Sequence, residues 1–292
     1  MKFGIFAPLV NPFATADYLQ TLGPAAEERG FDSIWVAEHV LLFDEYKSRY
    51  PYANDGRIPV PPESGILDPF VALSYLAAVT NSIRLGTGIC LVPQRNPVYT
   101  AKEVATLDWL SGGRFDLGIG VGWLAEEFEA LDVPFEHRGS RCRAYIDVMK
   151  TLWTDPISEY SGAYYELAPT RQFPKPIQQP HPPIHFGGES NAALRRVADL
   201  GQGWYGFNLE ADQLTERIAH LVTLLEERGR KRSDIEISVC PYLLSAGPEL
   251  IDRYQDAGVD RVILVASATE PDSLVKALDE MASAFAVKMG VG

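Results

Sequence analysis

Apolar and polar positions follow two alternating patterns along the chain. Short apolar, β-branched runs predict eight strands, at residues 3–9, 33–39, 83–92, 114–122, 183–188, 203–208, 236–243 and 261–267. Between them, apolar residues recur at helical spacing, most clearly at 16–30, 68–80, 100–113, 211–229 and 272–285. Eight such units in 292 residues favour an α/β fold in which a parallel sheet closes into a (β/α)8 TIM barrel. An open doubly wound sheet is the alternative.

Two segments exceed what a minimal barrel needs. Residues 40–67, after the second strand, are aromatic, rich in proline and aperiodic, which predicts a long loop. Residues 123–181, between the fourth and fifth barrel strands, contain a helical stretch and then a probable hairpin with a proline-rich return. No linker composition separates two halves of the chain. We therefore expect a single domain over residues 1–292 that carries both segments as insertions.

The charge of the chain narrows the choice of partners. The formal net charge is −13, and the only basic run is the short "RGRKR" at 228–232. Nucleic acids and anionic membrane surfaces are therefore not expected as partners, and an anionic ligand must be met by a local group of cations.

The positions of the cysteines and histidines bear on the redox compartment of the protein and on metal binding. Cys90, Cys142 and Cys240 are far apart and lack metal-ligand spacing, which favours free thiols in a reducing compartment. The histidines form neither HxH nor HExxH, so no metal centre is expected. No secretory signal and no run of ~18 apolar residues is present, so the expectation is a cytoplasmic protein without a membrane partner.

The end of the fifth barrel strand carries a glycine pair, Gly187 and Gly188, directly before a helix that starts at Ser190. Glycines let backbone N–H groups approach a ligand closely, and a serine cap lies at the positive end of the helix dipole, so this turn is a candidate phosphate cradle. A simple tight turn explains the pair equally well. Glu189 fits beside a phosphate only if its carboxylate points to solvent, and helix geometry lets at most one of Arg195 and Arg196 face the ligand.

Two other strand ends carry candidate chemistry. Gly118, Gly120 and Gly122 share one face of the fourth strand, which permits either close approach of a flat ring or tight packing inside the barrel. A final glycine is missing, so this is not a dinucleotide fingerprint. His39 ends the second strand and is a candidate acid, base or orienting group, with a structural histidine as the alternative. By strand alternation Glu38 should point to the opposite side.

Four ordered motifs together resemble the bacterial luciferase-like monooxygenases: "GFDSIWVAEH", "DPFVALSYLAAVTNSIRLGTGICLVP", "GRFDLGIGVGW" and "PPIHFGGES". Within that superfamily, "GVGWLAEEFEAL" is most similar to the actinobacterial oxidoreductases that depend on the deazaflavin coenzyme F420. The similarity is clear to about residue 208 and looser beyond it.

The resemblance implies a barrel that binds a flavin or deazaflavin where its strands end. Gly187, Gly188 and Ser190 would hold the cofactor phosphate, and a bulge with a non-prolyl cis peptide at Gly88–Ile89 would back the ring. The residues that we expect to bind cofactor are Gly88, Ile89, Cys90, Gly120, Gly122, Gly187, Gly188, Glu189 and Ser190. His39 is the expected catalytic residue, and Trp123 and Glu38 are expected in the substrate pocket.

One departure bears on the substrate. In the sugar-phosphate dehydrogenases of the superfamily a glutamate stands where this chain has Trp123, so that substrate class is in doubt here. The tyrosines and prolines of segments 40–67 and 155–180, which we expect to shield the site from water, favour a small, largely apolar substrate.

Three functions fit this picture: an F420-dependent hydride-transferring oxidoreductase, an FMN-dependent monooxygenase that activates oxygen, and a non-catalytic flavin-binding barrel. The oligoglutamate tail of F420 needs a basic exit groove, for which Arg171, Lys175 and Arg195 are the candidates. The family often forms dimers, so a homodimer is possible.

Overall fold

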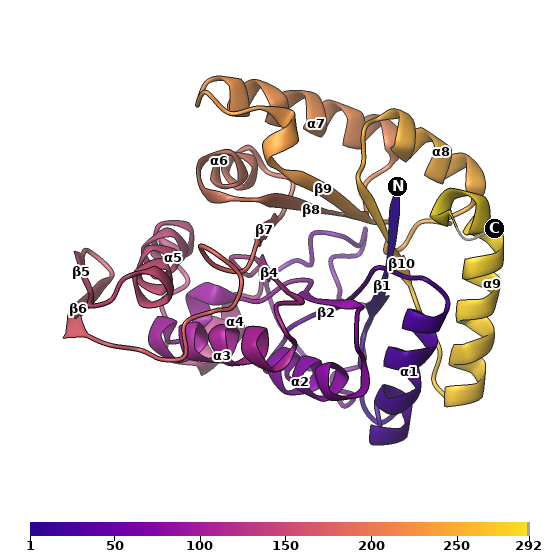
Figure 1. The fold of residues 1–292 in the computed structure, drawn as a ribbon, viewed down its shortest axis with the longest axis horizontal. Coiled ribbons are helices and arrows are strands. Elements are labelled where there is room, and N and C mark those ends of the chain that lie inside the picture. The colour runs from indigo at the N-terminus through magenta and orange to yellow at the C-terminus, as the bar shows by residue number, and fades with distance from the viewer. Residues whose placement is uncertain (291–292) are drawn as a thin grey trace.

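The computed structural model describes residues 1–290, and within them eight parallel strands close into a barrel (Figure 1). Around the barrel the order is β1, β10, β9, β8, β7, β4, β3 and β2. The barrel strands are β1 Lys2–Ala7, β2 Ser33–Val36, β3 Arg84–Thr87, β4 Phe115–Ile119, β7 Ile184–Gly187, β8 Gly203–Phe207, β9 Glu236–Cys240 and β10 Arg261–Val265. Each predicted strand is therefore confirmed in a shorter form, and the TIM-barrel prediction is confirmed over the open sheet.

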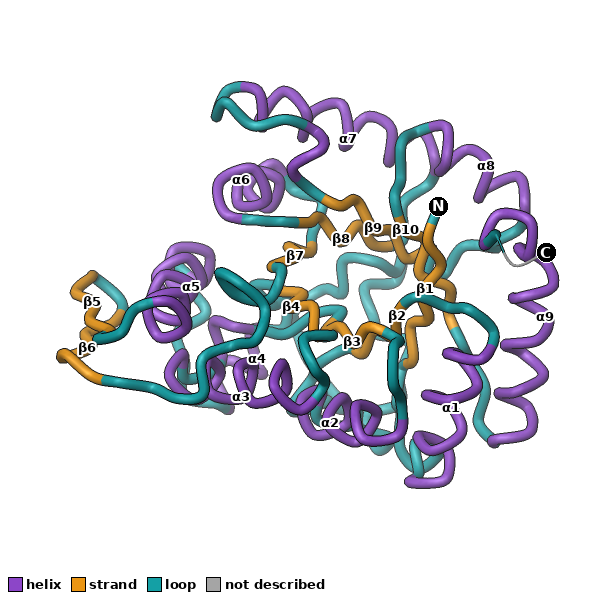
Figure 2. Tube along the Cα trace, in the orientation of Figure 1, coloured by secondary structure: helices purple, strands orange, loops and turns teal. Residues whose placement is uncertain are grey.

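Helices form the outer ring around the strands, as Figure 2 shows. They are α1 Ala16–Glu28, α2 Pro69–Val79, α3 Pro97–Leu110, α4 Ala125–Ala130, α5 Arg138–Thr154, α6 Asn191–Leu200, α7 Ala211–Glu226, α8 Pro248–Asp256 and α9 Pro271–Met289, with short 3-10 turns η1 Val92–Gln94 and η2 Arg232–Asp234. Several begin where the sequence predicts. The Asp68 and Asn96 side chains accept hydrogen bonds from the first turns of α2 and α3, each of which opens on a proline.

The two insertions have different structures. Residues 37–68 contain no helix and no strand and run across the end of the barrel where the strands finish. The second insertion holds α4, α5 and an antiparallel hairpin of β5 Ser158–Gly162 and β6 Tyr165–Thr170. This hairpin packs against α5 at the periphery of the molecule (Figure 1).

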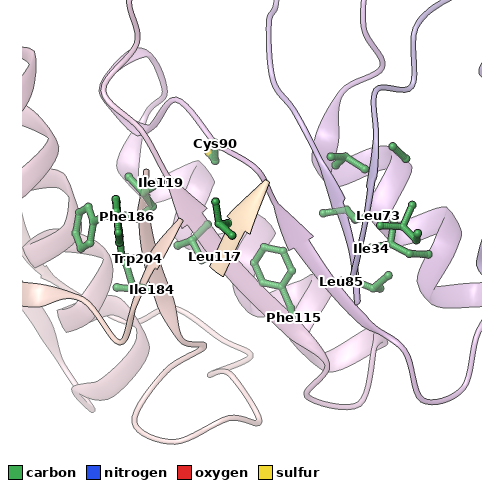
Figure 3. Packing of buried hydrophobic residues seen from close by; sticks show 14 of the residues in the cluster. Ile34, Leu73, Leu85, Cys90, Phe115, Leu117, Ile119, Ile184, Phe186 and Trp204 are labelled. Atoms are coloured by element: carbon green, nitrogen blue, oxygen red, sulfur yellow. The ribbon is translucent and has the colours of Figure 1, made fainter. Parts of the chain in front are cut away.

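The barrel has an outer and an inner core. The outer core fills the space between strands and helices, where Ile34, Leu85, Leu117 and Phe186 are buried (Figure 3). The inner core lies inside the barrel and consists of Phe6, Trp35, Tyr205, Cys240 and Ile263. Burial of these side chains away from water provides the main driving force for closing the barrel.

Ion pairs close the barrel at the end opposite the cavity described below. Arg261, only 1% exposed, contacts the carboxylates of Asp32 and Glu236, and the Arg84 Nε donates to Asp116 Oδ2 at 2.8 Å. These residues stand at or next to the amino-terminal ends of their strands. Buried charges of opposite sign need this mutual pairing, so the lower end of the barrel is a structural plug.

We predict that Gly118→Ala destabilises the fold strongly. A Cβ at residue 118 would lie 1.8 Å from the carbonyl oxygen of Thr87, so the backbone of β3 would have to shift. Urea denaturation should show a loss of at least about 2 kcal/mol in the free energy of unfolding. Gly247→Ala is the matched control, because a Cβ there meets no atom within 4 Å, and its effect should stay within about 1 kcal/mol.

Candidate active site

A cavity opens where the barrel strands end, among the strand ends that carry the predicted site residues. It encloses about 1130 Å³ of empty space, including the space at its mouth. Its walls come from residues after β1, β2, β3, β4, β7 and β9, from the end of β8 and from the loop 37–68. Ten of the predicted site residues line it: Glu38, His39, Gly88, Ile89, Gly120, Gly122, Trp123, Gly187, Gly188 and Ser190.

The floor of the cavity is a ridge formed by Ile89. The Gly88–Ile89 peptide bond is cis, and the Ile89 side chain occupies the room that two neighbouring glycines leave. A Cβ on Gly120 would lie 1.8 Å from Ile89 Cδ1, and one on Gly187 would lie 3.1 Å from Ile89 Cγ2. Gly120 and Gly187 are therefore required for packing, because a side chain at residue 120 would collide with the Ile89 side chain and one at residue 187 would crowd it.

The β7–α6 turn forms a cationic end of the cavity. Gly188 has φ +97°, a conformation that favours glycine, and Ser190 caps α6 by accepting from Ala193 N at 3.2 Å. Arg196 also lines the cavity, whereas Arg195 is exposed. Of the two arginines, the structure thus brings one to the cavity, as helix geometry predicts.

Arg196 and Arg138 place positive charge beside this turn without a counter-ion. Among residues 1–290, no carboxylate lies within 4.0 Å of either guanidinium. Burial, and then the neighbouring Arg196, lower the pKa of Arg138, while burial lowers the pKa of Arg196. Two half-buried arginines that repel each other beside a helix N-terminus form a site complementary to an anion. Arg138 was not predicted, because nothing in its local sequence indicates that α5 starts next to α6.

His39 belongs to a chain of three side chains. Trp123 Nε1 donates to His39 Nε2 at 3.3 Å, and His39 Nδ1 lies 3.1 Å from Glu127 Oε2. Because the indole can only donate, Nε2 is the accepting nitrogen, and Nδ1 carries the proton that it donates to Glu127. The histidine is therefore fixed in one tautomer with its basic nitrogen at the cavity.

Glu127 is the functional residue that sequence reasoning missed. It is fully buried, and besides His39 it accepts from Gln94 Nε2 at 3.0 Å and from Val40 N and Leu41 N at 2.7 and 3.1 Å. Burial raises its pKa, but the hydrogen bonds and charge of His39 and its other donors outweigh burial, so its pKa lies below the ordinary value. The signal available in the sequence was a carboxylate at the start of α4, at a position that looks like an ordinary exposed helix turn.

An aromatic wall faces the glycine floor. Trp123 packs edge-on against Tyr46 and Tyr50 of the loop, with ring centroids 5.6 and 5.2 Å apart. Across the cavity, Phe207 packs against Tyr52 and Tyr242, both with centroids 4.8 Å apart. Segment 37–68 thus covers the site as expected, and Trp123 closes the cavity as a wall.

Of the predicted site residues, Cys90 and Glu189 do not line the cavity, and Glu38 lines it with a carboxylate that already has partners. The Glu38 carboxylate accepts from Leu91 N at 2.5 Å and lies 3.3 Å from Arg95 Nε, so its charge is already partnered away from the cavity. Cys90 is absent from the lining, because it continues the pairing with β4 and its side chain lies in the outer core (Figure 3). Glu189 does not meet the condition set for a place beside a phosphate, because its carboxylate turns inward to the Tyr52 hydroxyl and Phe207 N instead of pointing to solvent.

The second insertion does not shield the cavity, which corrects the expectation for 155–180. None of residues 155–180 lines the cavity. Arg171 donates to the carbonyl of Pro156 and Lys175 to those of Leu152 and Asp155, so both cations complete the hairpin and the end of α5. With Arg195 exposed on α6, the three cations expected at a cofactor tail do not gather at one exit.

Comparison with known proteins agrees with this geometry. The profile of the luciferase-like monooxygenase family matches residues 1–278. The chain belongs to this family. Its enzymes are flavin- or F420-dependent oxidoreductases or monooxygenases, and the chain is an enzyme of that kind. The resemblance found in the sequence is therefore confirmed at the level of the family.

Similar proteins include sequence relatives and solved structures. The chain is 34% identical over 243 residues to the uncharacterized protein Rv0940c of Mycobacterium tuberculosis, covering 83% of both chains. Monooxygenase RslO1 from Streptomyces bottropensis superimposes with a TM-score of 0.76 at 23% identity, covering 99% of both chains. An F420-dependent secondary alcohol dehydrogenase in complex with an F420–acetone adduct gives a TM-score of 0.76 at 19% identity, covering 97% of both.

The described part of this luciferase-like chain, residues 1–290, contains neither a helix that could span a membrane nor a metal-binding cluster of side chains. Across residues 1–290, no helix combines the length and apolarity needed to cross a bilayer. In the same residues, no three His, Cys, Asp or Glu side chains gather as a metal site. Cys90, Cys142 and Cys240 are free and buried, which confirms the prediction of free thiols.

We predict that Glu127 contributes to an acid-sensitive part of the stability. Its folded pKa is depressed, so its contribution is present above the unfolded pKa and is lost as pH falls through the folded pKa. Glu127→Gln should lower the free energy of unfolding by about 1.5–3 kcal/mol at pH 7 and flatten its fall below about pH 4.5. Glu129→Gln, on the exposed side of the same helix, should reproduce the wild-type curve. A steep acid limb that persists in Glu127→Gln would contradict the assignment.

Proposed function

We propose that the chain binds coenzyme F420 in this cavity and transfers a hydride between the deazaflavin and a small, uncharged, largely apolar substrate. One observation carries the proposal: an apolar ridge on a glycine floor lies between an anion-complementary turn and His39. Such a floor accommodates a flat ring, and such a turn accommodates the phosphate to which the ring is attached.

The cofactor would be held by groups already in position. The N–H groups at Gly188 and the start of α6, the Ser190 hydroxyl and Arg196 would bind the phosphate, while Ile89 would support one face of the ring. When bound, the deazaflavin supplies the hydride chemistry, and the protein supplies orientation and exclusion of water. The glycine floor leaves only one face of the ring open to a substrate.

His39 is suited to take a proton from a substrate hydroxyl. Its Nε2 accepts a long hydrogen bond, 3.3 Å, from Trp123, which a closer hydroxyl donor can replace. Uptake of this proton would leave a positive charge on the imidazole ring of His39. The buried Glu127 carboxylate, which accepts from His39 Nδ1, would stabilise that charge. Glu127 is thus a positioning residue that acts through His39.

The substrate class follows from the aromatic wall. The substrate side is formed by Phe6, Tyr50, Ile58, Val60, Phe207 and Tyr242. Of the charged side chains that line the cavity, Glu38 is partnered by Arg95 and Arg196 lies at the turn end. A charged substrate would lose its hydration without gaining a partner, whereas an apolar alcohol or ketone needs only one polar contact at His39.

FMN-dependent oxygen activation is the second candidate, and one observation favours it. Arg171, Lys175 and Arg195 do not form the basic exit that the F420 tail needs, whereas FMN ends at its phosphate. The solved relatives include a monooxygenase and an F420-dependent dehydrogenase of similar fold, so the fold supports both.

Titration with each cofactor separates the candidates. Purified chain is titrated with FMN and with F420 by fluorescence quenching, and each reduced complex is tested against a panel of neutral secondary alcohols and ketones. The proposal expects tighter binding of F420 and hydride transfer without oxygen consumption. Tight FMN binding with oxygen uptake would favour the second candidate, and binding without turnover would favour a non-catalytic barrel.

Arg196→Ala tests the cradle itself. Loss of one charge-assisted contact should weaken binding of FMN, used as a phosphate-bearing probe, by about 10- to 100-fold. Binding of riboflavin, which lacks the phosphate, should change less than about twofold. Arg195→Ala is the matched control, because the neighbouring Arg195 side chain is exposed and outside the lining. Equal losses for FMN and riboflavin would contradict a phosphate contact.

A further inference from the structure

Glu189 and Tyr52 are joined by a hydrogen bond at the edge of the cavity. Tyr52, from the loop 37–68, donates its hydroxyl to Glu189 Oε2 at 3.2 Å. The other carboxylate oxygen, Oε1, accepts from Phe207 N at the end of β8 at 3.0 Å. Tyr52 itself lines the cavity, so the carboxylate is connected to the ligand space through a tyrosine hydroxyl.

Glu189 is a buried acid with only neutral donors. Among residues 1–290, no Lys, Arg or His lies within 4.0 Å of its carboxylate, in contrast to Asp116, Glu127 and Glu236. The titratable groups that face it are Tyr52 and Tyr50 of the loop, and β8 contributes only the Phe207 N–H. An acid in such surroundings exchanges its proton readily near neutrality. Burial raises the pKa of Glu189 to about 7, despite its hydrogen bonds from Phe207 and Tyr52.

The Tyr52 hydroxyl remains a proton donor at neutral pH. Burial, and then the charge of Glu189, raise its pKa well above the ordinary value. A tyrosine that stays protonated beside a carboxyl group that titrates near neutrality can pass a proton without itself accumulating as a phenolate.

The pair lies across the barrel from His39. His39 follows β2, whereas Glu189 follows β7, three strands from β2 around the closed barrel. The Glu189 carboxylate accepts from Phe207 N at the end of β8, four strands from β2. Hydride transfer between an alcohol and a deazaflavin moves a proton at two places, the substrate oxygen and the ring. His39 can serve only one of them, so a second group is needed on another wall.

We propose that Tyr52 and Glu189 form a second proton-transfer pair of the cavity, on the wall opposite His39. In one direction, the Tyr52 hydroxyl gives its proton to a basic atom of the bound ligand while the Glu189 carboxyl gives its own proton to the Tyr52 oxygen. One O–H bond breaks and one forms at Tyr52, the carboxyl becomes a carboxylate, and water restores its proton. No electrons move in this step. The inference rests on the proposed function of the cavity.

The first test needs no cofactor and no substrate. The full chain is labelled with 13C at the glutamate side-chain carboxyl, and the resonance lost in Glu189→Gln is assigned to Glu189. Its titration midpoint should lie near pH 7 in the wild type and move higher in Tyr52→Phe, because a hydrogen bond to the carboxylate is lost. Glu159→Gln, at an exposed position on β5, is the control and should leave the Glu189 resonance unchanged. A midpoint in the ordinary glutamate range would overturn the proposal.

The second test uses the loaded enzyme with the best substrate of the alcohol and ketone panel. Glu189→Gln and Tyr52→Phe should lower kcat by about 10- to 1000-fold, and Glu189→Gln should remove a limb near pH 7 from the pH profile. Their cofactor affinity should stay within about twofold of the wild type, as should every property of the exposed control Tyr99→Phe.

A different result is expected if the Tyr52–Glu189 hydrogen bond only holds the loop 37–68 in place. Either variant would then lower the melting temperature and weaken cofactor binding while leaving the shape of the pH profile unchanged, and that outcome overturns the proposal. If the wild type binds neither F420 nor FMN, the proposed function fails in the titration, before any variant is compared. If it binds and turns over while the variants keep the wild-type profile, only the second proton-transfer pair fails.

Discussion

The site depends on a steric constraint: Ile89 can stand in the end of the barrel only because Gly120 and Gly187 have no side chains. A Cβ on Gly120 would overlap Ile89 Cδ1, and a Cβ on Gly118 would overlap the backbone of β3 one step earlier. The ridge packs against the inner barrel core, and with Phe6 and Tyr205 of that core it lines the cavity as an apolar surface. The ends of β3, β4 and β7 therefore fit together only with glycine at residues 120 and 187, and under the proposed function they would support a planar ligand.

The charged and apolar side chains of the cavity lie at different ends. The protein as a whole is strongly acidic, yet Arg138 and Arg196 remain without carboxylate partners beside the start of α6. On the opposite, aromatic side, the residues of the described range 1–290 contribute no unpartnered charge apart from the hydrogen-bonded Glu189 behind Tyr52. An anionic group and an apolar group thus find separate places within one cavity, with His39 between them held by the buried Glu127.

Much of this arrangement could be predicted because it depends on local sequence. Strands, helix caps and the Gly187–Ser190 turn follow from periodicity and from the conformational preferences of glycine and serine. Glu127 and Arg138 could not be found in this way, since their roles come from contacts with residues 88 and 16 positions away. Patterns within a short stretch of sequence do not predict contacts between residues that far apart in the chain.

The wrong expectations have the same physical origin. Glu189 was expected to bind cofactor, which required its carboxylate to point to solvent, but Tyr52, 137 positions earlier, supplies a donor that holds the carboxylate inside. The segment 155–180 was expected over the cavity because it is long and aromatic, but its cations bind the carbonyls at the end of α5 and hold it at the periphery. The composition of segment 155–180 does not specify where the segment packs, whereas the contacts in the structure do.

The most direct measurement of the central claim is a crystal structure of the chain soaked with F420 or with FMN. The account predicts the cofactor phosphate at Gly188, Ser190 and Arg196, with the ring on Ile89 and its open face toward His39. A cofactor bound elsewhere, or a cradle that stays empty while the crystals take up cofactor, would contradict it.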